Sequence, residues 1–301
     1  MTKLFLWFKA TRTPFFTASF IPVLVGNAVA FSDGSFYLWR FIVTLLGVTA
    51  VHAGANLLND YYDCITGCDE INSEYTIFNG GSRCLQDGLF KTRDYMFAAI
   101  ISYSLGLIAA IYLLIVIRNW MLIIPAFFGL LAGIFYSYPR FYLMGKGWGE
   151  IIIWLTFGPA VVSGAYMVQT GHITLTALLA GVPIGFLIMG ILYLNQFPDA
   201  KADLLVGKKN WVVRLGRNTI AVMVFFLIIS ACYLSIVFGL LNKSFPPAVV
   251  IAFLSLPLAF WVCHKTWQCY NVTSKLLPAM GGNIFLHFVT GLLIAVGFLI
   301  K

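Results

Sequence analysis

Residues 219–241 read TIAVMVFFLIISACYLSIVFGLL, an apolar run without a charged side chain. A helix needs about 20 such residues to cross the hydrocarbon core of a bilayer, so this run predicts a transmembrane helix. Similar runs, bounded by polar or charged residues, lie on both sides of it. The predicted spans are Phe15–Ala30, Trp39–Leu58, Met96–Ile117, Met121–Ser137, Glu150–Val168, Leu175–Leu194, Thr219–Leu241, Ala248–Cys263 and Asn283–Ile300. We therefore expect an all-α, polytopic membrane protein with about nine transmembrane helices.

The composition indicates a protein whose main solvent is lipid. Apolar residues make up 60% of the chain and charged residues 10%, whereas a soluble domain carries roughly 25% charged residues. Because apolar runs recur along the whole chain, a soluble domain with one membrane anchor is excluded. The first run lacks a small-residue cleavage site, so we interpret it as a retained helix and not as a signal peptide.

The basic residues are distributed unevenly between the two sides that these spans define. Arg40, Arg118, Lys243 and Lys301 fall on one side, and all other Lys and Arg residues fall on the opposite side. An excess of Lys and Arg marks the cytoplasmic side, so we expect a cell-membrane protein with a cytoplasmic N-terminus. The net charge of +8 is spread over many short loops, and nucleic-acid binding is not expected. We interpret residues 1–301 as one transmembrane domain with cytoplasmic cap loops at about 59–95, 138–149, 195–218 and 264–282.

Carboxylates gather on the same side as most of the basic residues. Every Asp and Glu except Asp33 falls there. The second span ends in Asn59-Asp60-Tyr61-Tyr62-Asp63 and the sixth in Asn195-Gln196-Phe197-Pro198-Asp199, so an Asn precedes an Asp by four residues in both. Residues four apart share a helix face, and Asp203 extends the second acidic stripe if the helix continues past Pro198. The equivalent positions predict two helical bundles whose acidic ends converge.

Carboxylates that lie close together predict a bound cation. They repel one another unless a positive charge lies between them. Mg²⁺ prefers oxygen ligands and commonly completes its coordination shell with phosphate oxygens and water. Two facing acidic stripes are therefore predicted to hold a diphosphate through Mg²⁺.

Basic and aromatic side chains near these motifs suit a lipid diphosphate. Arg83 follows Asn79-Gly80-Gly81-Ser82 and Lys146 lies between two glycines, where the backbone can approach a ligand closely. Arg and Lys bind phosphate oxygens. Departure of diphosphate from an allylic chain leaves a carbocation that aromatic faces stabilise, and Tyr138 and Tyr193 are the candidates for this role.

These motifs resemble those of the UbiA superfamily of intramembrane prenyltransferases. Asn59-Asp60-Tyr61-Tyr62-Asp63, followed by Gly67 and Asp69, resembles the first family motif, and Asp199-Ala200-Lys201-Ala202-Asp203, followed by Gly207-Lys208, resembles the second. Two further stretches resemble motifs of the subgroup that makes menaquinone: Arg12-Thr13-Pro14 and Arg214-Leu215-Gly216. The resemblance implies a UbiA-like arrangement of nine helices around a central cavity. It also implies Mg²⁺-dependent transfer of a polyprenyl group from its diphosphate to a small, often aromatic acceptor.

Roles for individual residues follow from these motifs and their basic neighbours. The candidate metal ligands are Asp60, Asp63, Asp69, Asp199 and Asp203. The candidate catalytic residues are Asn59, Asp63, Asn195, Asp199 and Asp203. The candidate diphosphate-binding residues are Asn56, Asn59, Arg83, Lys146, Asn195 and Lys208. Asn56 and Asp60 repeat the same spacing three residues earlier, which leaves the register of the first motif open.

The acceptor is less well defined by the sequence than the donor. We favour 1,4-dihydroxy-2-naphthoate, with attack at the carboxylated carbon and loss of CO₂. The chain departs from the menaquinone subgroup because Gln196-Phe197-Pro198 stands before Asp199, with no Arg directly before that Asp. Relatives that prenylate a hydroxybenzoate, a glycerol-phosphate lipid or haem remain alternatives. A secondary transporter is the alternative from another class, but its acidic residues would be expected nearer the centres of the spans.

Overall fold

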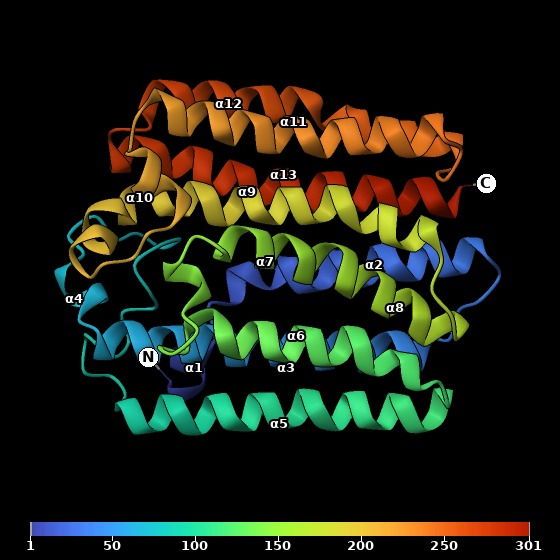
Figure 1. Cartoon of the computed structure of the whole chain (residues 1–301), viewed down its shortest axis with the longest axis horizontal. Helices are drawn as coiled ribbons and strands as arrows, with labels where there is room; N and C mark the ends of the chain where they lie inside the picture. The colour runs from blue at the N-terminus through green and yellow to red at the C-terminus, as the bar shows by residue number, and fades with distance from the viewer. Residues whose placement is uncertain (1, 301) are drawn as a thin grey trace.

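The computed structural model describes residues 2–300, which form a bundle of long helices (Figure 1). The elements are α1 (Lys3–Ala10), η1 (Thr13–Phe16), α2 (Thr17–Ser32), α3 (Leu38–Ile65), α4 (Cys68–Ile71), α5 (Thr92–Ile117), η2 (Trp120–Leu122), α6 (Ile123–Ser137), η3 (Leu143–Gly145), α7 (Gly149–Leu155), η4 (Thr156–Ala160), α8 (Val161–Thr170), α9 (Leu175–Leu205), α10 (Trp211–Leu215), α11 (Thr219–Leu241), η5 (Pro247–Ser255), α12 (Leu256–Cys269) and α13 (Thr273–Leu299). Nine helical stretches within residues 2–300 are long and apolar enough to cross a bilayer. This confirms the predicted all-α, multi-pass membrane fold.

The helices form two groups with a shared middle (Figure 1). Helices α3, α5 and α6 pack together in one group, and α9, α11, α12 and α13 pack together in the other. Helix α2 and the span made of α7, η4 and α8 contact both groups. The short helices α4 and α10 gather at the same end of the bundle as α1, opposite the end where α13 finishes (Figure 1).

Helices α3 and α9 continue well beyond their apolar stretches. The predicted spans end at Leu58 and Leu194, but the helices end at Ile65 and Leu205, so both acidic motifs are helical. Pro198 lies inside α9 without ending it. The predicted cap loops at 59–95 and 195–218 therefore begin too early, and α12 and α13 cover most of the predicted loop at 264–282. A hydropathy pattern does not predict these extensions. The hydropathy falls where the side chains become polar, but the backbone remains helical beyond that point.

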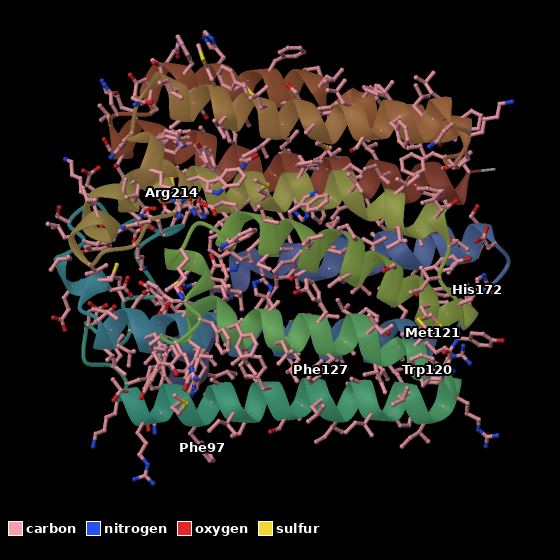
Figure 2. The ribbon with its side chains drawn as sticks, viewed as in Figure 1. Phe97, Trp120, Met121, Phe127, His172 and Arg214 are labelled. Atoms are coloured by element: carbon pink, nitrogen blue, oxygen red, sulfur yellow. The ribbon has the colours of Figure 1, made fainter. Side chains whose placement is uncertain are left out.

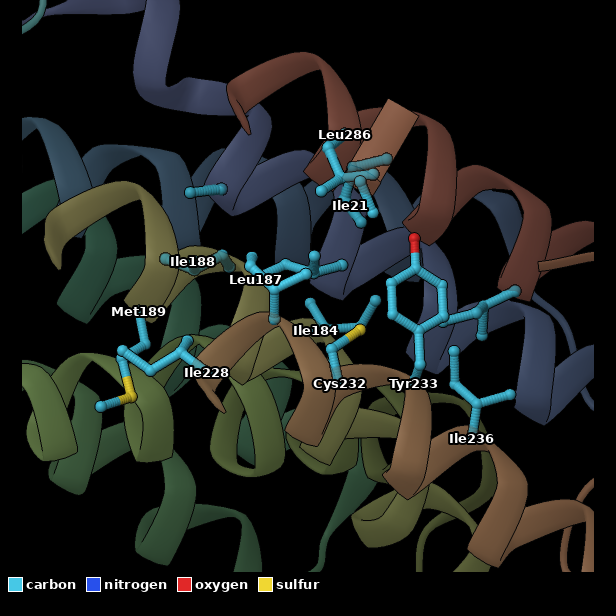
Figure 3. Packing of buried hydrophobic residues seen from close by; sticks show 14 of the residues in the cluster. Ile21, Ile184, Leu187, Ile188, Met189, Ile228, Cys232, Tyr233, Ile236 and Leu286 are labelled. Carbon is cyan, nitrogen blue, oxygen red and sulfur yellow. The ribbon is translucent and has the colours of Figure 1, made fainter. Parts of the chain in front are cut away.

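The second group of helices contains the larger apolar core (Figure 3). Buried side chains from α2, α9, α11 and α13 meet there: Ile21, Ile184, Leu187, Ile188, Met189, Ile228, Cys232, Tyr233, Ile236 and Leu286. Helix α9 also approaches η4 so closely that only glycine fits at the crossing. A Cβ atom on Gly158 would lie 2.5 Å from the carbonyl oxygen of Gly181. This packing fixes α9, which carries the second acidic motif, against the middle of the bundle.

The outer surface of the bundle carries large apolar side chains (Figure 2). Phe97 on α5 is 64% exposed and Trp120 in η2 is 70% exposed. A soluble monomer rarely exposes contiguous apolar area on this scale. This surface is the one that lipid covers in a multi-pass protein.

Glu74 ties the segment after α4 to the second group of helices. Its carboxylate accepts a hydrogen bond from Arg217 Nη1 at 2.6 Å and another from the Thr273 hydroxyl, and it lies 3.2 Å from Lys201 Nζ. Partial burial raises the pKa of Glu74, but these donors outweigh that effect and lower it to about 2. The segment that covers the end of the bundle is therefore held by a charged carboxylate.

Glu74→Gln is expected to lower the free energy of unfolding by about 2 kcal/mol at neutral pH, because hydrogen bonds to a charged group are lost. Since the pKa falls from 4.5 to about 2 on folding, this stability is present above about pH 4.5 and is lost as the pH falls towards 2. Thermal unfolding of the detergent-solubilised protein, measured from pH 7 to pH 2, tests this. The two proteins should differ at pH 7, and the difference should shrink below about pH 4.5 and become smallest near pH 2. A constant difference at every pH contradicts the assignment, and Glu70→Gln, an exposed residue on α4, is the matched control.

Candidate active site

A single lysine joins the ends of α3 and α9. Lys208 Nζ lies 2.8 Å from Asp63 Oδ1 and 3.3 Å from Asp203 Oδ1, and all three side chains are buried. Burial lowers the pKa of Lys208, but Asp63 and Asp203 outweigh this and raise it well above its ordinary value. The ammonium group is therefore charged and lies between the two acidic motifs. The predicted convergence of the two motifs is present in the structure.

The first motif presents one face to the cavity and another to Arg12. Asn59 Nδ2 donates to Asp63 Oδ2 at 3.2 Å, one helical turn away. Asp60 points elsewhere: it binds the guanidinium of Arg12 and accepts from the backbone N–H of Ser82 at 2.9 Å. Arg12 Nη2 also donates to Asn59 Oδ1 at 3.2 Å. Asn56, Asn59 and Asp63 line the cavity, whereas Asp60 is not among its lining residues within 2–300, and this geometry favours the register of Asn59 and Asp63.

Arg12 is a site residue whose place the sequence did not reveal. It has a left-handed backbone, with φ of 54°, between α1 and η1, which turns its side chain back onto α3. Burial lowers its pKa, but the carboxylates of Asp60, Asp69 and Asp63 outweigh that effect and raise it above the ordinary value. Its position directly before the first span was visible in the sequence, but its partners were not.

Asp69 lies under the loop that contains Gly80 and Gly81. Burial, followed by the charges of Asp63 and Asp60, raises the pKa of Asp69 above its ordinary value. Gly81 has a φ of 74°, and a Cβ atom there would lie 2.3 Å from Asp69 Oδ2. The loop can therefore pass directly over the carboxylate only because this residue has no side chain.

Two asparagines bind the second motif from the segment after α4. Asn72 Nδ2 and Asn79 Nδ2 each donate to Asp199 Oδ1 at 2.6 Å, and both asparagines are buried. Asp203, one turn further along α9, accepts from Asn210 Nδ2 at 2.7 Å. Asn72 and Asn79 are not among the site residues that the sequence predicts. The one local signal in the sequence is the stretch Asn79-Gly80-Gly81-Ser82, whose glycines indicate a close approach of the backbone.

A cavity of about 440 Å³ opens beside these residues. Its polar end is lined by Arg12, Asn56, Asn59, Asp63, Asp69, Asn195, Asp199, Asp203 and Lys208. The rest of its wall is mainly apolar and comes from α3, α5, α6, η4 and α9, with side chains such as Val51, Leu107, Leu130, Phe157 and Ile188. The cavity therefore suits a molecule with a charged head and an apolar tail.

Several predicted site residues lie away from this cavity. Arg83 donates to the Asp69 carbonyl oxygen and lies over the Tyr75 ring, and Lys146 Nζ reaches the Arg140 carbonyl oxygen at 3.4 Å. Arg83, Lys146, Tyr138, Tyr193 and Asp60 are absent from the residues that line the cavity within 2–300.

The two tyrosines predicted to face a carbocation have other surroundings. Tyr138 is 40% exposed and its ring lies beside Tyr62. Tyr193 is fully buried on the face of α9 that packs against α11, where its hydroxyl donates to the Ala221 carbonyl oxygen at 3.0 Å. The aromatic rings that line the cavity are those of Phe15, Phe78, Phe127, Tyr136 and Phe157.

The polar end of the cavity fits a hard divalent cation such as Mg²⁺. Its donors are carboxylate and amide oxygens, the ligands that Mg²⁺ prefers. The position of Lys208 Nζ demonstrates that one cation can reach carboxylates of both motifs at once. Among the described residues, no group of three or more His, Cys, Asp and Glu is already arranged around a metal position.

The chain has clear relatives of known description. The model of the UbiA prenyltransferase family matches residues 19–297. The 2-carboxy-1,4-naphthoquinone phytyltransferase of Synechocystis is 29% identical over 294 residues, which cover 97% of this chain and 92% of that protein. UbiA prenyltransferase domain-containing protein 1 of Xenopus tropicalis is 31% identical over 295 residues, which cover 95% of this chain and 81% of that protein.

A solved structure has the same fold. The UbiA homolog from Archaeoglobus fulgidus bound to GPP and Mg²⁺ superposes with a TM-score of 0.64 at 17% identity, covering 97% of this chain and 99% of that chain. At this identity the likeness supports the fold alone. Because the family match runs from the first span to the last and includes both acidic motifs, this chain belongs to the UbiA prenyltransferase family.

Proposed function

We propose that this enzyme transfers a polyprenyl group from its diphosphate to 1,4-dihydroxy-2-naphthoate, with loss of CO₂. The observation that carries the proposal is the meeting of two acidic motifs at the polar end of an apolar cavity, with Lys208 between Asp63 and Asp203. A diphosphate suits the polar end, and an isoprenoid chain suits the apolar wall. The site therefore matches an amphiphilic donor whose reactive carbon lies where the two parts meet.

The acidic residues and Mg²⁺ would act together on the diphosphate. Asp63, Asp69, Asp199 and Asp203 would hold Mg²⁺, which when bound neutralises the negative charge that grows on the departing diphosphate. Asn59 and Asn195 lie one turn before Asp63 and Asp199 and line the same cavity, so their amides are in reach of the same phosphate group. Lys208 is the cation nearest both motifs and would contribute a point charge to a phosphate oxygen.

The apolar wall would protect the reactive allylic carbon. Phe15, Phe78 and Phe157 line the cavity, and aromatic faces stabilise a cation through their quadrupoles. The wall also excludes water, which would otherwise capture the allylic cation. These phenylalanines take the role that the sequence analysis gave to Tyr138 and Tyr193.

The choice of acceptor rests on the relatives. One relative is described as a 2-carboxy-1,4-naphthoquinone phytyltransferase and matches nearly the full length of both chains. The basic side chains near the acidic end favour a cytoplasmic position for that end in the cell membrane, with the segments around α4 and α10 forming the cap.

A transfer assay tests this proposal. The purified protein in detergent or nanodiscs is incubated with radiolabelled prenyl diphosphate and a panel of acceptors, with Mg²⁺ or with EDTA. We expect label to reach the naphthalene diol only with Mg²⁺, with one CO₂ released for each prenyl group transferred. Transfer only to a hydroxybenzoate, a glycerol-phosphate lipid or haem overturns the acceptor and keeps the enzyme class. Absence of Mg²⁺-dependent diphosphate release overturns the proposed reaction.

A further inference from the structure

His52 lies in the wall of the cavity, deeper than the acidic residues. It shares one face of α3 with Asn56, Asn59 and Asp63, and all four line the cavity. His52 precedes Asn59 by seven residues, or about 10 Å along the helix axis, and precedes Asp63 by about 16 Å. This separation leaves room for a bicyclic ring between the diphosphate end and the imidazole.

The imidazole of His52 is held in one orientation by its neighbours. Its Nδ1 lies 2.8 Å from the hydroxyl oxygen of Ser19, which is fully buried on α2. Its ring meets the rings of Phe16 at 5.5 Å and Phe157 at 4.9 Å, both edge to face. When Nδ1–H donates to Ser19, the lone pair is on Nε2, the nitrogen that this contact leaves free.

The surroundings of His52 contain few other ionisable groups. Ser19, Phe16 and Phe157, which pack against it from α2, η1 and η4, are uncharged. Arg12 is the charged side chain whose field reaches the imidazole. The other titratable cavity residues described, Asp63, Cys68, Asp69, Tyr136, Asp199, Asp203 and Lys208, surround the polar end and interact with one another there.

We propose that His52 is the general base that takes the hydroxyl proton of the aromatic acceptor. This inference rests on the proposed function, because it needs an acceptor with a hydroxyl group. The proton of the hydroxyl beside the carboxylated carbon moves to Nε2 of His52. The ring oxygen then supplies electrons to that carbon, which attacks the prenyl C1 as the bond from C1 to the diphosphate oxygen breaks. The diphosphate leaves with that electron pair.

The same residue completes the reaction. After the attack, the acceptor carries a ketone beside a carbon that holds both the prenyl group and the carboxylate, which is a β-keto acid. Loss of CO₂ returns the electrons of the broken carbon–carbon bond to the ring and forms a naphtholate. The naphtholate oxygen takes the proton back from His52. The imidazole therefore accepts one proton and returns it in each turnover, and no other reactant is needed.

The test compares the full-length wild-type protein with His52→Gln, which keeps hydrogen-bonding atoms but is not a base. We expect turnover with the dihydroxynaphthoate to fall about 10²-fold at pH 7, as is typical when a general base is removed. The affinity for Mg²⁺ and prenyl diphosphate, measured by isothermal titration calorimetry, should stay unchanged. The turnover of the wild type should fall as acid protonates the imidazole, whereas the turnover of His52→Gln should lack this fall, so the ratio of the two rates should change with pH.

Three results overturn the inference: a wild-type rate in His52→Gln, a loss of diphosphate affinity, or a rate ratio that stays constant at every pH. His264→Gln is the matched control, since His264 is exposed on α12 and bonds to Gln268 outside the cavity. The proposed function fails if the wild-type protein itself does not prenylate the dihydroxynaphthoate. The His52 inference fails if the wild type is active and the variant gives one of the three results above.

Discussion

Asp199→Asn is expected to lower prenyl transfer about 10³-fold, an effect of the size seen when a group that stabilises developing charge is removed. The substitution keeps the shape of the side chain and an oxygen that can still accept from Asn72 and Asn79, which now bind Asp199 Oδ1 at 2.6 Å. It removes the negative charge that a divalent cation needs. The loss should therefore appear in Mg²⁺ affinity and turnover and not in folding.

The measurement for Asp199→Asn has two parts. Turnover is followed across Mg²⁺ concentrations, and thermal unfolding in detergent verifies that the variant is folded. Asp33→Asn is the matched control, because Asp33 ends α2 far from both motifs and accepts a hydrogen bond from the Tyr166 hydroxyl at 2.7 Å. Wild-type turnover in Asp199→Asn at ordinary Mg²⁺ concentrations contradicts the assignment of Asp199 to the metal site. Asp63→Asn should give a loss of the same order.

The helices were predictable from the sequence because lipid imposes a simple rule on them. A span such as Thr219–Leu241 is apolar along its whole length, and hydropathy identifies it directly. The rule fails where a helix leaves the hydrocarbon. Helices α3 and α9 remain helical to Ile65 and Leu205, because backbone hydrogen bonds continue after the side chains become polar.

The pairing of each Asn with its Asp could be predicted from the sequence, because both pairs follow the helical repeat. Asn59 and Asp63 lie one turn apart, as do Asn195 and Asp199, and residues with this spacing share a face. Whether that face points to a cavity is settled by tertiary packing. Asp60 belongs to the same motif, but its side chain is rotated about 100° around the helix from Asn59 and binds Arg12 instead.

Residues outside the helices could not be placed from the sequence. Asn72 and Asn79 lie in an irregular segment whose path depends on contacts with Asp199 and on the fit of Gly81 over Asp69. No local pattern describes such a path. Tyr138 and Tyr193 are not among the described residues that line the cavity, because closeness to the acidic end of a span does not determine which way a ring points.

Lys208 is expected to be the most important single charge for the stability of the metal-free protein. Lys208→Met keeps most of the length of the side chain and removes the ammonium that lies between Asp63 and Asp203. Removing one partner of a buried ion pair leaves an uncompensated charge and costs about 3 kcal/mol or more. In EDTA, the variant should therefore unfold at a clearly lower temperature than the wild type.

Mg²⁺ should reverse much of the loss caused by Lys208→Met. In the wild type, Lys208 already neutralises Asp63 and Asp203, so a divalent cation has to compete with it for the same oxygens. The variant lacks this competitor, and Mg²⁺ should raise its unfolding temperature by more than it raises that of the wild type. Lys209→Met, which changes the exposed neighbour, is the matched control and should behave as the wild type. Equal Mg²⁺ shifts in Lys208→Met and in the wild type contradict the idea that ammonium and metal share one position. A larger shift in the variant supports the idea that the lysine ammonium holds the position that Mg²⁺ takes.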